Sequence, residues 1–154
     1  MGRYAENTKV SLERSQEEIK RVLRKYDADK FGIMEEKTQA HLMFEFRGLL
    51  IQMTVKFPDR EEFKCTPTGN PRAETAIKTA WDQAVKQRWR ALNLAVKAKL
   101  EAVEVGISTI EQEFMAFIMM PDGKNLSDHL LPEIRQIAST GKMPKLLGSG
   151  TSGE

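Results

Sequence analysis

Histidine, cysteine and carboxylate side chains are the groups in this sequence that could act as bases, nucleophiles or metal ligands. The two histidines are His41, on the polar face of a predicted strand, and His129, near a predicted helix start. Neither has a second histidine or a cysteine three or four residues further along, as a helical metal site would need. We therefore expect surface or capping histidines, with no metal and no cofactor.

The single thiol and the acidic pairs offer little further chemistry. Cys65 lies beside Lys64, whose charge favours a thiolate, but no neighbouring histidine offers a base. One cysteine cannot form an intrachain disulfide, which agrees with a reducing compartment. In pairs such as Glu17-Glu18 the side chains diverge on a helix or a strand. We therefore predict a protein that is not an enzyme; the alternative is a site that joins His41 or His129 to carboxylates only in the fold.

The charge of the chain is small but unevenly distributed. The 154 residues carry 24 Lys and Arg against 22 Asp and Glu, a formal charge of +2 that does not itself indicate nucleic acid. Residues 72–99 carry seven basic and two acidic side chains, whereas residues 100–154 carry four and eight. Apolar runs are too short to span a bilayer, and the N-terminal residues lack the apolar core of a secretory signal. We therefore expect a cytoplasmic protein with no membrane partner.

Hydrophobic periodicity predicts one α+β domain over residues 1–147, followed by a flexible Gly- and Ser-rich tail over 148–154. Ser15-Gln16-Glu17-Glu18 fits a capping box and predicts a first helix over 15–27. Alternation with period two predicts a three-stranded antiparallel sheet between residues 30 and 57. One face of this sheet is apolar, so we expect the first helix and a long second helix to cover it.

The predicted register of the last two strands depends on the turn at Arg47-Gly48. A two-residue turn there places all the apolar residues of both strands on one face. It pairs Phe46 with Leu49, Phe44 with Ile51, Leu42 with Met53 and Ala40 with Val55. Glycine suits the second turn position but arginine does not suit the first, so a bulged turn is the alternative.

A long amphipathic helix is predicted over residues 72–105, after a loop at 58–71 and before a stop at Gly106. Its apolar stripe consists of Trp81, Val85, Trp89, Leu92, Val96, Leu100 and Val103. A helix of that length measures about 50 Å, more than the diameter of a small domain. We therefore expect part of it to project or to form a homo-oligomer, unless the C-terminal helices cover Leu100 and Val103.

Two further helices are predicted in the C-terminal third. Ser108-Thr109-Ile110-Glu111 reads as a second capping box, and Ser127 is positioned to cap a final helix that ends at Thr140-Gly141. Pro132 is expected to kink this final helix near its start.

Five cations of the long helix are the candidate binding residues: Lys86, Arg88, Arg90, Lys97 and Lys99. On a helical wheel Lys86, Arg90 and Lys97 fall within about 40° of one another, while Arg88 and Lys99 border the apolar stripe on its other side. Such cations can follow a phosphate backbone, with Trp89 or Phe63 as a stacking surface. The alternative is a solvated helix whose Lys and Arg stems shield its hydrophobic seam.

Several short motifs resemble those of a family of small proteins from bacteriophages, prophages and other mobile elements. The matching stretches span residues 4 to about 147 and include Tyr4-Ala5-Glu6-Asn7-Thr8, Thr66-Pro67-Thr68-Gly69, Gln87-Arg88-Trp89-Arg90-Ala91-Leu92, Pro121-Asp122-Gly123 and Gly141-Lys142-Met143-Pro144. That family has no settled activity, so the resemblance implies a setting and no catalytic residues. It implies a phage-type accessory protein in a bacterial cytoplasm, where such proteins handle DNA or neutralise host defences.

The sequence therefore predicts a non-enzymatic, phage-type accessory that binds DNA or RNA backbone through the long helix. The alternative is a protein-binding inhibitor of a host defence system, such as a CRISPR or other nuclease complex. Its binding surface would use the acidic C-terminal third or the methionine side chains. The partner is accordingly nucleic acid or a host nucleoprotein complex.

Overall fold

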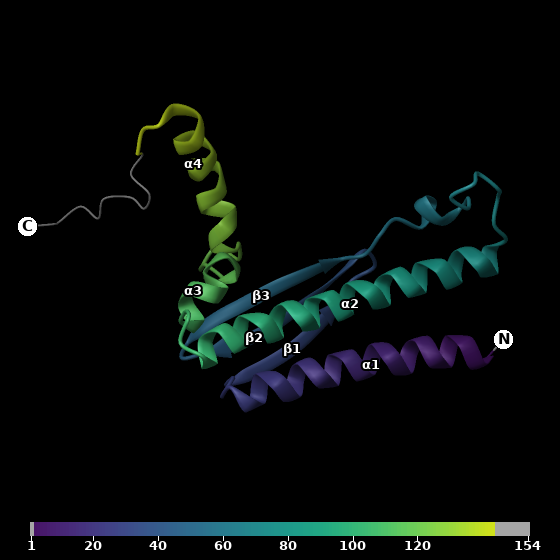
Figure 1. The fold of residues 1–154 in the computed structure, drawn as a ribbon, viewed down its shortest axis with the longest axis horizontal. Helices are drawn as coiled ribbons and strands as arrows, with labels where there is room; N and C mark the ends of the chain where they lie inside the picture. The colour runs from purple at the N-terminus through teal and green to yellow at the C-terminus, as the bar shows by residue number, and fades with distance from the viewer. Residues whose placement is uncertain (1, 144–154) are drawn as a thin grey trace, which may run out of the picture.

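The computed structural model describes residues 2–143, with side chains described from Leu12 onward. The predicted tail at 148–154 lies outside these residues. The elements are α1 (Gly2–Lys25), β1 (Lys30–Glu35), β2 (Gln39–Phe46), β3 (Leu49–Lys56), η1 (Arg60–Phe63), α2 (Glu74–Glu104), α3 (Ile110–Phe114), η2 (Met115–Phe117) and α4 (Leu126–Thr140) (Figure 1). The predicted α+β architecture is confirmed.

The three strands form an antiparallel sheet in the order β1-β2-β3. All four predicted apolar pairs across β2 and β3 are present, from Phe46 opposite Leu49 to Ala40 opposite Val55. Both residues of the connecting turn have positive φ, 48° at Arg47 and 80° at Gly48, as the tight hairpin turn that matches strand twist requires. The register is uninterrupted, so the turn is the two-residue form and not the bulged alternative.

The positive φ of Arg47 gives a stability prediction. The left-handed region costs an ordinary residue about 1–2 kcal/mol, and asparagine tolerates it better than arginine does. We expect Arg47→Asn to raise the free energy of unfolding by about 0.5–1 kcal/mol in urea denaturation. Gly48→Ala, at φ 80°, should lower it. An unchanged midpoint for Arg47→Asn would show that the turn carries no such strain.

The core lies between the apolar face of the sheet and the two long helices, which run parallel and side by side over it (Figure 1). Trp89 of α2 and Phe44 of β2 are fully buried at its centre, together with Ile19 and Leu23 of α1. Phe114 of α3 closes one end. Hydrophobic burial of this kind is the main source of stability for helices laid on a sheet.

Three predicted helix starts are wrong. Helix α1 begins at Gly2, so Ser15 lies inside the helix and its capping-box pattern does not mark an end. The reason is that no proline interrupts the segment before Ser15. Helix α3 is capped by Thr109 with Gln112, one residue after the predicted Ser108 pair. Helix α4 begins after Asn125, whose backbone N–H donates to Asp128, so the cap is not Ser127.

The predicted stops of α2 and α4 are confirmed. Gly106, at φ 78°, follows the end of α2, and Gly141, at φ 66°, ends α4 with its N–H bonded to the carbonyl of Ile137. Pro132 lies inside α4.

The apolar stripe of α2 is covered within the chain. Val96 and Leu100 are fully buried, and Val103 is half-buried, because α1, the sheet and α3 surround this part of the helix. The exposure of Leu100 and Val103 that led us to expect a homo-oligomer through α2 is therefore absent. No helix within residues 2–143 is long and apolar enough to cross a membrane.

Candidate nucleic-acid interface

The five predicted cations of α2 lie on opposite flanks of the helix. Lys97 faces α1, where its Nζ bonds the carboxylate of Glu18. Lys99 faces α3, and Arg88 reaches β3, where it donates to the carbonyl of Lys56 at 3.0 Å. The flanks predicted from the helical wheel are thus observed, but the five side chains do not converge on one surface.

Lys97 is part of a polar cluster between the two long helices. Glu18 accepts hydrogen bonds from Lys97 and, at 2.8 Å, from Nδ2 of Asn93, which is only 5% exposed. These two bonds hold the pKa of the Glu18 carboxyl below its ordinary value. The charge of Lys97 is therefore matched within the chain and serves to join α1 to α2.

This cluster makes stability depend on pH. Because the pKa of Glu18 is lower in the folded protein than in the unfolded chain, its stabilising effect is full above the ordinary value of 4.5 and is lost as the pH falls through the lowered value. We expect Glu18→Gln to reduce the difference between urea midpoints measured at about pH 7 and about pH 3. Lys97→Gln, which removes the main cause of the shift, should do the same. If Glu18→Gln keeps the full wild-type difference, the cluster has no such role.

Lys99 is also held within the chain. Its Nζ donates to the carbonyl of Glu113 at 2.9 Å and lies 3.5 Å from the carboxylate of the same residue. The ammonium also lies 5.8 Å from the ring centre of Phe114 and 5.7 Å from that of Phe117. The carboxylate of Glu113 accepts from Ser108 as well, which is the main reason that its pKa is lowered. Lys99 therefore anchors α3 on α2.

The other three cations of the predicted set have no carboxylate partner within the described residues. Arg88 and Arg90 are exposed, and Lys86 is half-buried. The outward face of α2 lies between the flank that carries Arg88 and the flank that carries Arg90. On this face the helix has small or uncharged side chains, including Ala91, Leu94 and Ala98. Since a helix with its side chains is only about 10–12 Å wide, cations on both borders of this face can reach one chain of phosphates that crosses it.

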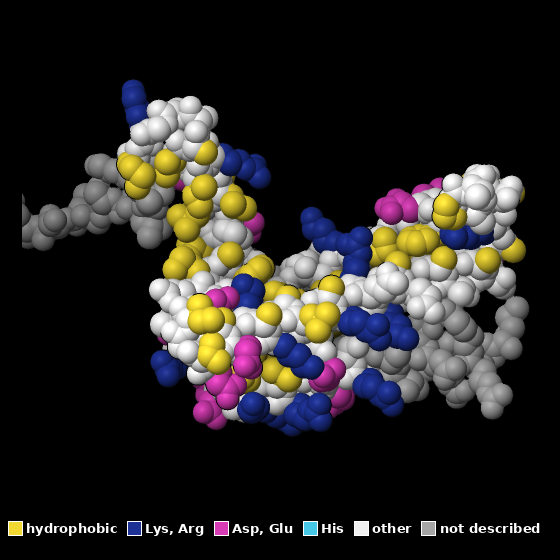
Figure 2. All heavy atoms as spheres, in the orientation of Figure 1, with side chains coloured by type: hydrophobic (Ala, Val, Ile, Leu, Met, Phe, Trp, Pro, Cys, Tyr) yellow, Lys and Arg dark blue, Asp and Glu magenta, His cyan; other side chains and the backbone are white. Residues whose placement is uncertain are grey.

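Further cations lie near the N-terminal half of α2, around a cavity of about 740 Å³. We call it the Trp81 pocket; its lining residues include Lys37, Thr38, Phe57, Arg60, Glu61 and Trp81. Trp81 precedes Arg88 by seven residues, so both lie on the same flank of α2, about 10 Å apart along the helix. In Figure 2 an apolar patch lies here beside Lys and Arg side chains.

Neither of the two predicted stacking residues lines the Trp81 pocket. Trp89 is fully buried and cannot contact a base, whereas Phe63 is half-buried and does not line the Trp81 pocket. Trp81, which the sequence assigned to the core, is half-buried beside the cavity. The sequence placed Trp81 at the end of the apolar stripe, but only the fold shows that this end borders a cavity.

The two histidines differ from each other. His129 is exposed and lies 2.9 Å from the carboxylate of Asp122, as expected of a surface histidine. The prediction of a surface histidine is wrong for His41, which is only 7% exposed because neighbouring polar side chains of the sheet cover its ring. Its two nitrogens contact Thr54 at 3.0 Å and Glu36 at 3.1 Å.

The remaining candidates for chemistry lie apart. Cys65 is an exposed free thiol. Within the part of the chain that is described, no three His, Cys, Asp or Glu side chains lie where they could hold a metal ion together. Comparison with protein-family models, curated proteins and solved structures found no match to this chain. The function of the protein is therefore inferred from the arrangement of its own side chains.

Proposed function

We propose that this protein is a non-enzymatic accessory of phage type that binds nucleic acid through cations on both borders of α2. The binding residues are Lys86, Arg88 and Arg90 of the predicted set. Lys97 and Lys99 support the interface by holding α1 and α3 against α2.

One observation carries this proposal: within the described residues Lys86, Arg88 and Arg90 have no carboxylate partner, while acidic side chains nearby are already paired. Lys78 pairs with Asp82 at 3.0 Å, and Lys64 pairs with Glu61 at 2.5 Å. Lys86 and Arg90 have neither a hydrogen bond nor an ion pair within the described residues, and Arg88 contacts only a carbonyl. In Figure 2 Lys and Arg side chains lie along the middle of α1 and α2, with Asp and Glu side chains among them and near the C-terminal ends of the two helices.

The direct test is binding of a fluorescently labelled oligonucleotide at low and rising salt. Contact of three cations with the phosphates of a single strand predicts that the logarithm of the affinity falls with the logarithm of the salt concentration with a slope of about −2. Failure to bind either single- or double-stranded probes at about 50 mM salt would remove this function.

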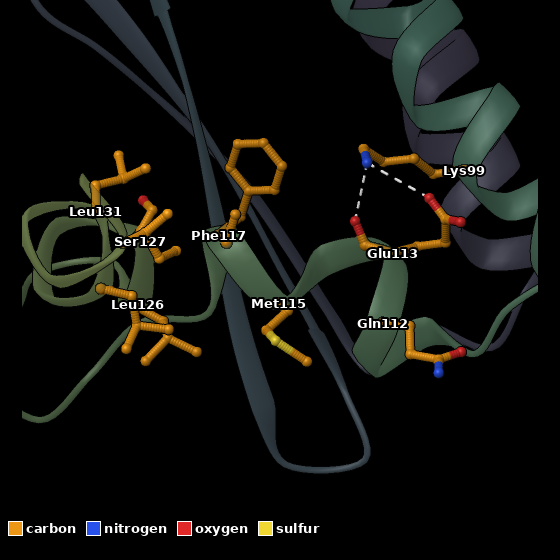
Figure 3. Close-up of a pocket in the computed structure, with 11 residues that line it drawn as sticks. Lys99, Gln112, Glu113, Met115, Phe117, Leu126, Ser127 and Leu131 are labelled. Atoms are coloured by element: carbon orange, nitrogen blue, oxygen red, sulfur yellow. Dashed lines mark hydrogen bonds and ion pairs between the residues drawn. The ribbon is translucent and has the colours of Figure 1, made fainter. Parts of the chain in front are cut away.

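A second candidate function, binding of a protein, is favoured by the C-terminal arm. Helix α4 projects away from the sheet and has no buried residue among its 15 (Figure 1). With η2 it forms a groove of about 380 Å³, lined mainly by apolar side chains (Figure 3). Leu131 is 44% exposed, Ile134 50% and Met115 46%. An amphipathic helix of another protein is the ligand that such a groove fits best.

Substitution in this groove distinguishes the two functions. Leu131→Asp with Ile134→Asp should abolish capture of a host protein, in the presence of nuclease, and leave oligonucleotide binding unchanged. Capture that survives these substitutions, or that nuclease abolishes, would count against the groove.

A further inference from the structure

The Trp81 pocket combines an aromatic side chain with cations that have no carboxylate partner in the described part of the chain. We infer that it accepts an unpaired nucleobase on Trp81, so that the ligand of the protein is a single strand and not a duplex. This inference rests on the proposed function and narrows it to one class of nucleic acid.

The indole of Trp81 is fixed in place. Its Nε1 donates to the carbonyl of Pro58 at 2.8 Å, and the ring of Phe57 stands edge-on to it at 6.0 Å and 84°. These two contacts hold the ring in one position, so stacking on it does not cost the ordering of a mobile side chain.

Trp81 packs against the core, and a cation lies over its ring. The guanidinium of Arg60 lies 5.6 Å from the centre of the Trp81 ring, and Arg60 is itself exposed. Stacked planes lie about 3.5 Å apart, so a base between the two groups needs about 7 Å. Arg60 therefore has to move by only about 1.5 Å to enclose a base between its guanidinium and the indole, two groups on which bases stack.

The charges around the cavity favour a phosphate. Lys37 lines it and is exposed, with no carboxylate partner among the described residues. Of the two acidic side chains of the lining, Glu61 pairs with Lys64, whereas Asp59 accepts from the N–H of Glu61 at 3.0 Å and keeps its charge. Arg88, about two turns further along α2, continues the basic surface. A single strand can thus place a base on Trp81 and its adjoining phosphates on Lys37 and Arg88.

A duplex cannot use this site in the same way, because its base faces are hidden in the stack and flipping one out requires unpairing. The inference therefore predicts discrimination by strand state. Contact with phosphates alone would leave a single strand and a duplex with similar, salt-dependent binding.

The experiment compares 12-nucleotide oligothymidylate with a 12-base-pair duplex. We expect the single strand to quench the fluorescence of Trp81, since the other tryptophan, Trp89, is fully buried. Trp81→Ala should weaken single-strand binding about 10-fold or more and change duplex binding by less than about twofold, whereas Trp81→Phe should retain most of the affinity. Phe63→Ala, a half-buried aromatic outside the cavity, is the matched control and should have no effect.

Each outcome decides the matter. Absence of any nucleic-acid binding removes the proposed function itself. Equal binding of single strand and duplex, or single-strand binding unaffected by Trp81→Ala, overturns only the base-binding inference and leaves contact with phosphates. If Trp81→Ala does not fold, two other measurements decide: the quenching of the wild-type protein by the single strand, and weaker single-strand binding by Arg60→Ser, a substitution at an exposed residue. Absence of both effects overturns the inference.

Discussion

Replacing Phe114 by alanine is expected to lower the free energy of unfolding by about 3–5 kcal/mol, the largest stability effect that we predict. Phe114 is fully buried and packs edge-on against Phe44, with ring centres 5.4 Å apart and an interplanar angle of 84°. It also lies under the ammonium of Lys99. Its removal leaves a cavity where α3 joins the sheet and α2.

Urea denaturation followed by circular dichroism measures this effect. Met115→Ala is the matched control, because Met115 is the next residue and is 46% exposed; we expect a change within about 0.5 kcal/mol. Since Phe114 fixes the segment that leads to α4, Phe114→Ala should also make the arm more sensitive to proteolysis. A loss of less than about 1 kcal/mol would mean that Phe114 does not hold this segment.

Reversing the three unmatched charges of α2 is expected to have the largest effect on binding. Lys86→Glu, Arg88→Glu and Arg90→Glu together should weaken oligonucleotide binding about 100-fold or more at low salt. The slope of the logarithm of the affinity against the logarithm of the salt concentration should become shallower by about 2, because about 0.7 is lost for each phosphate contact removed. The effect should be the same for all base sequences, since phosphates carry no sequence information.

The control carries the same change in net charge on the C-terminal arm. Lys124→Glu, Arg135→Glu and Lys142→Glu are exposed substitutions away from α2 and should weaken binding only slightly. Equal weakening by both triple variants would mean that binding follows net charge and not the surface of α2. Retained folding of both variants is checked by circular dichroism.

The sheet could be predicted from the sequence in detail because its determinants are local. Alternation with period two, together with glycine at the second turn position, permits only one register that gathers Phe44, Phe46, Leu49 and Ile51 on one face. The apolar stripe of α2 was predictable for the same reason. In both cases the pattern in the chain is itself the pattern of burial.

Helix ends were predicted less well because neighbouring residues compete as caps. Ser108 with Glu111 and Thr109 with Gln112 both fit the capping pattern, and the sequence does not show which pair the turn after α2 will orient. The side chain of Ser108 instead donates to Glu113. The choice depends on tertiary contacts.

The candidate site was only partly predictable, since charge matching and exposure depend on residues distant in sequence. Lys97 is paired with Glu18, which lies 79 residues earlier in the chain. Trp81 and Trp89 belong to the same stripe, and only the position of the sheet determines that Trp89 is buried while Trp81 borders a cavity. Neither fact follows from spacing along one helix.

The most direct test of the central claim is an NMR titration of the isotope-labelled protein with oligothymidylate, observing backbone amides and the two indole N–H groups. Binding at the surface of α2 predicts shifts at Lys86, Arg88, Arg90 and the Trp81 indole, with no change at α4. Shifts confined to α4 and η2, or no shifts at low salt, would contradict nucleic-acid binding by this helix.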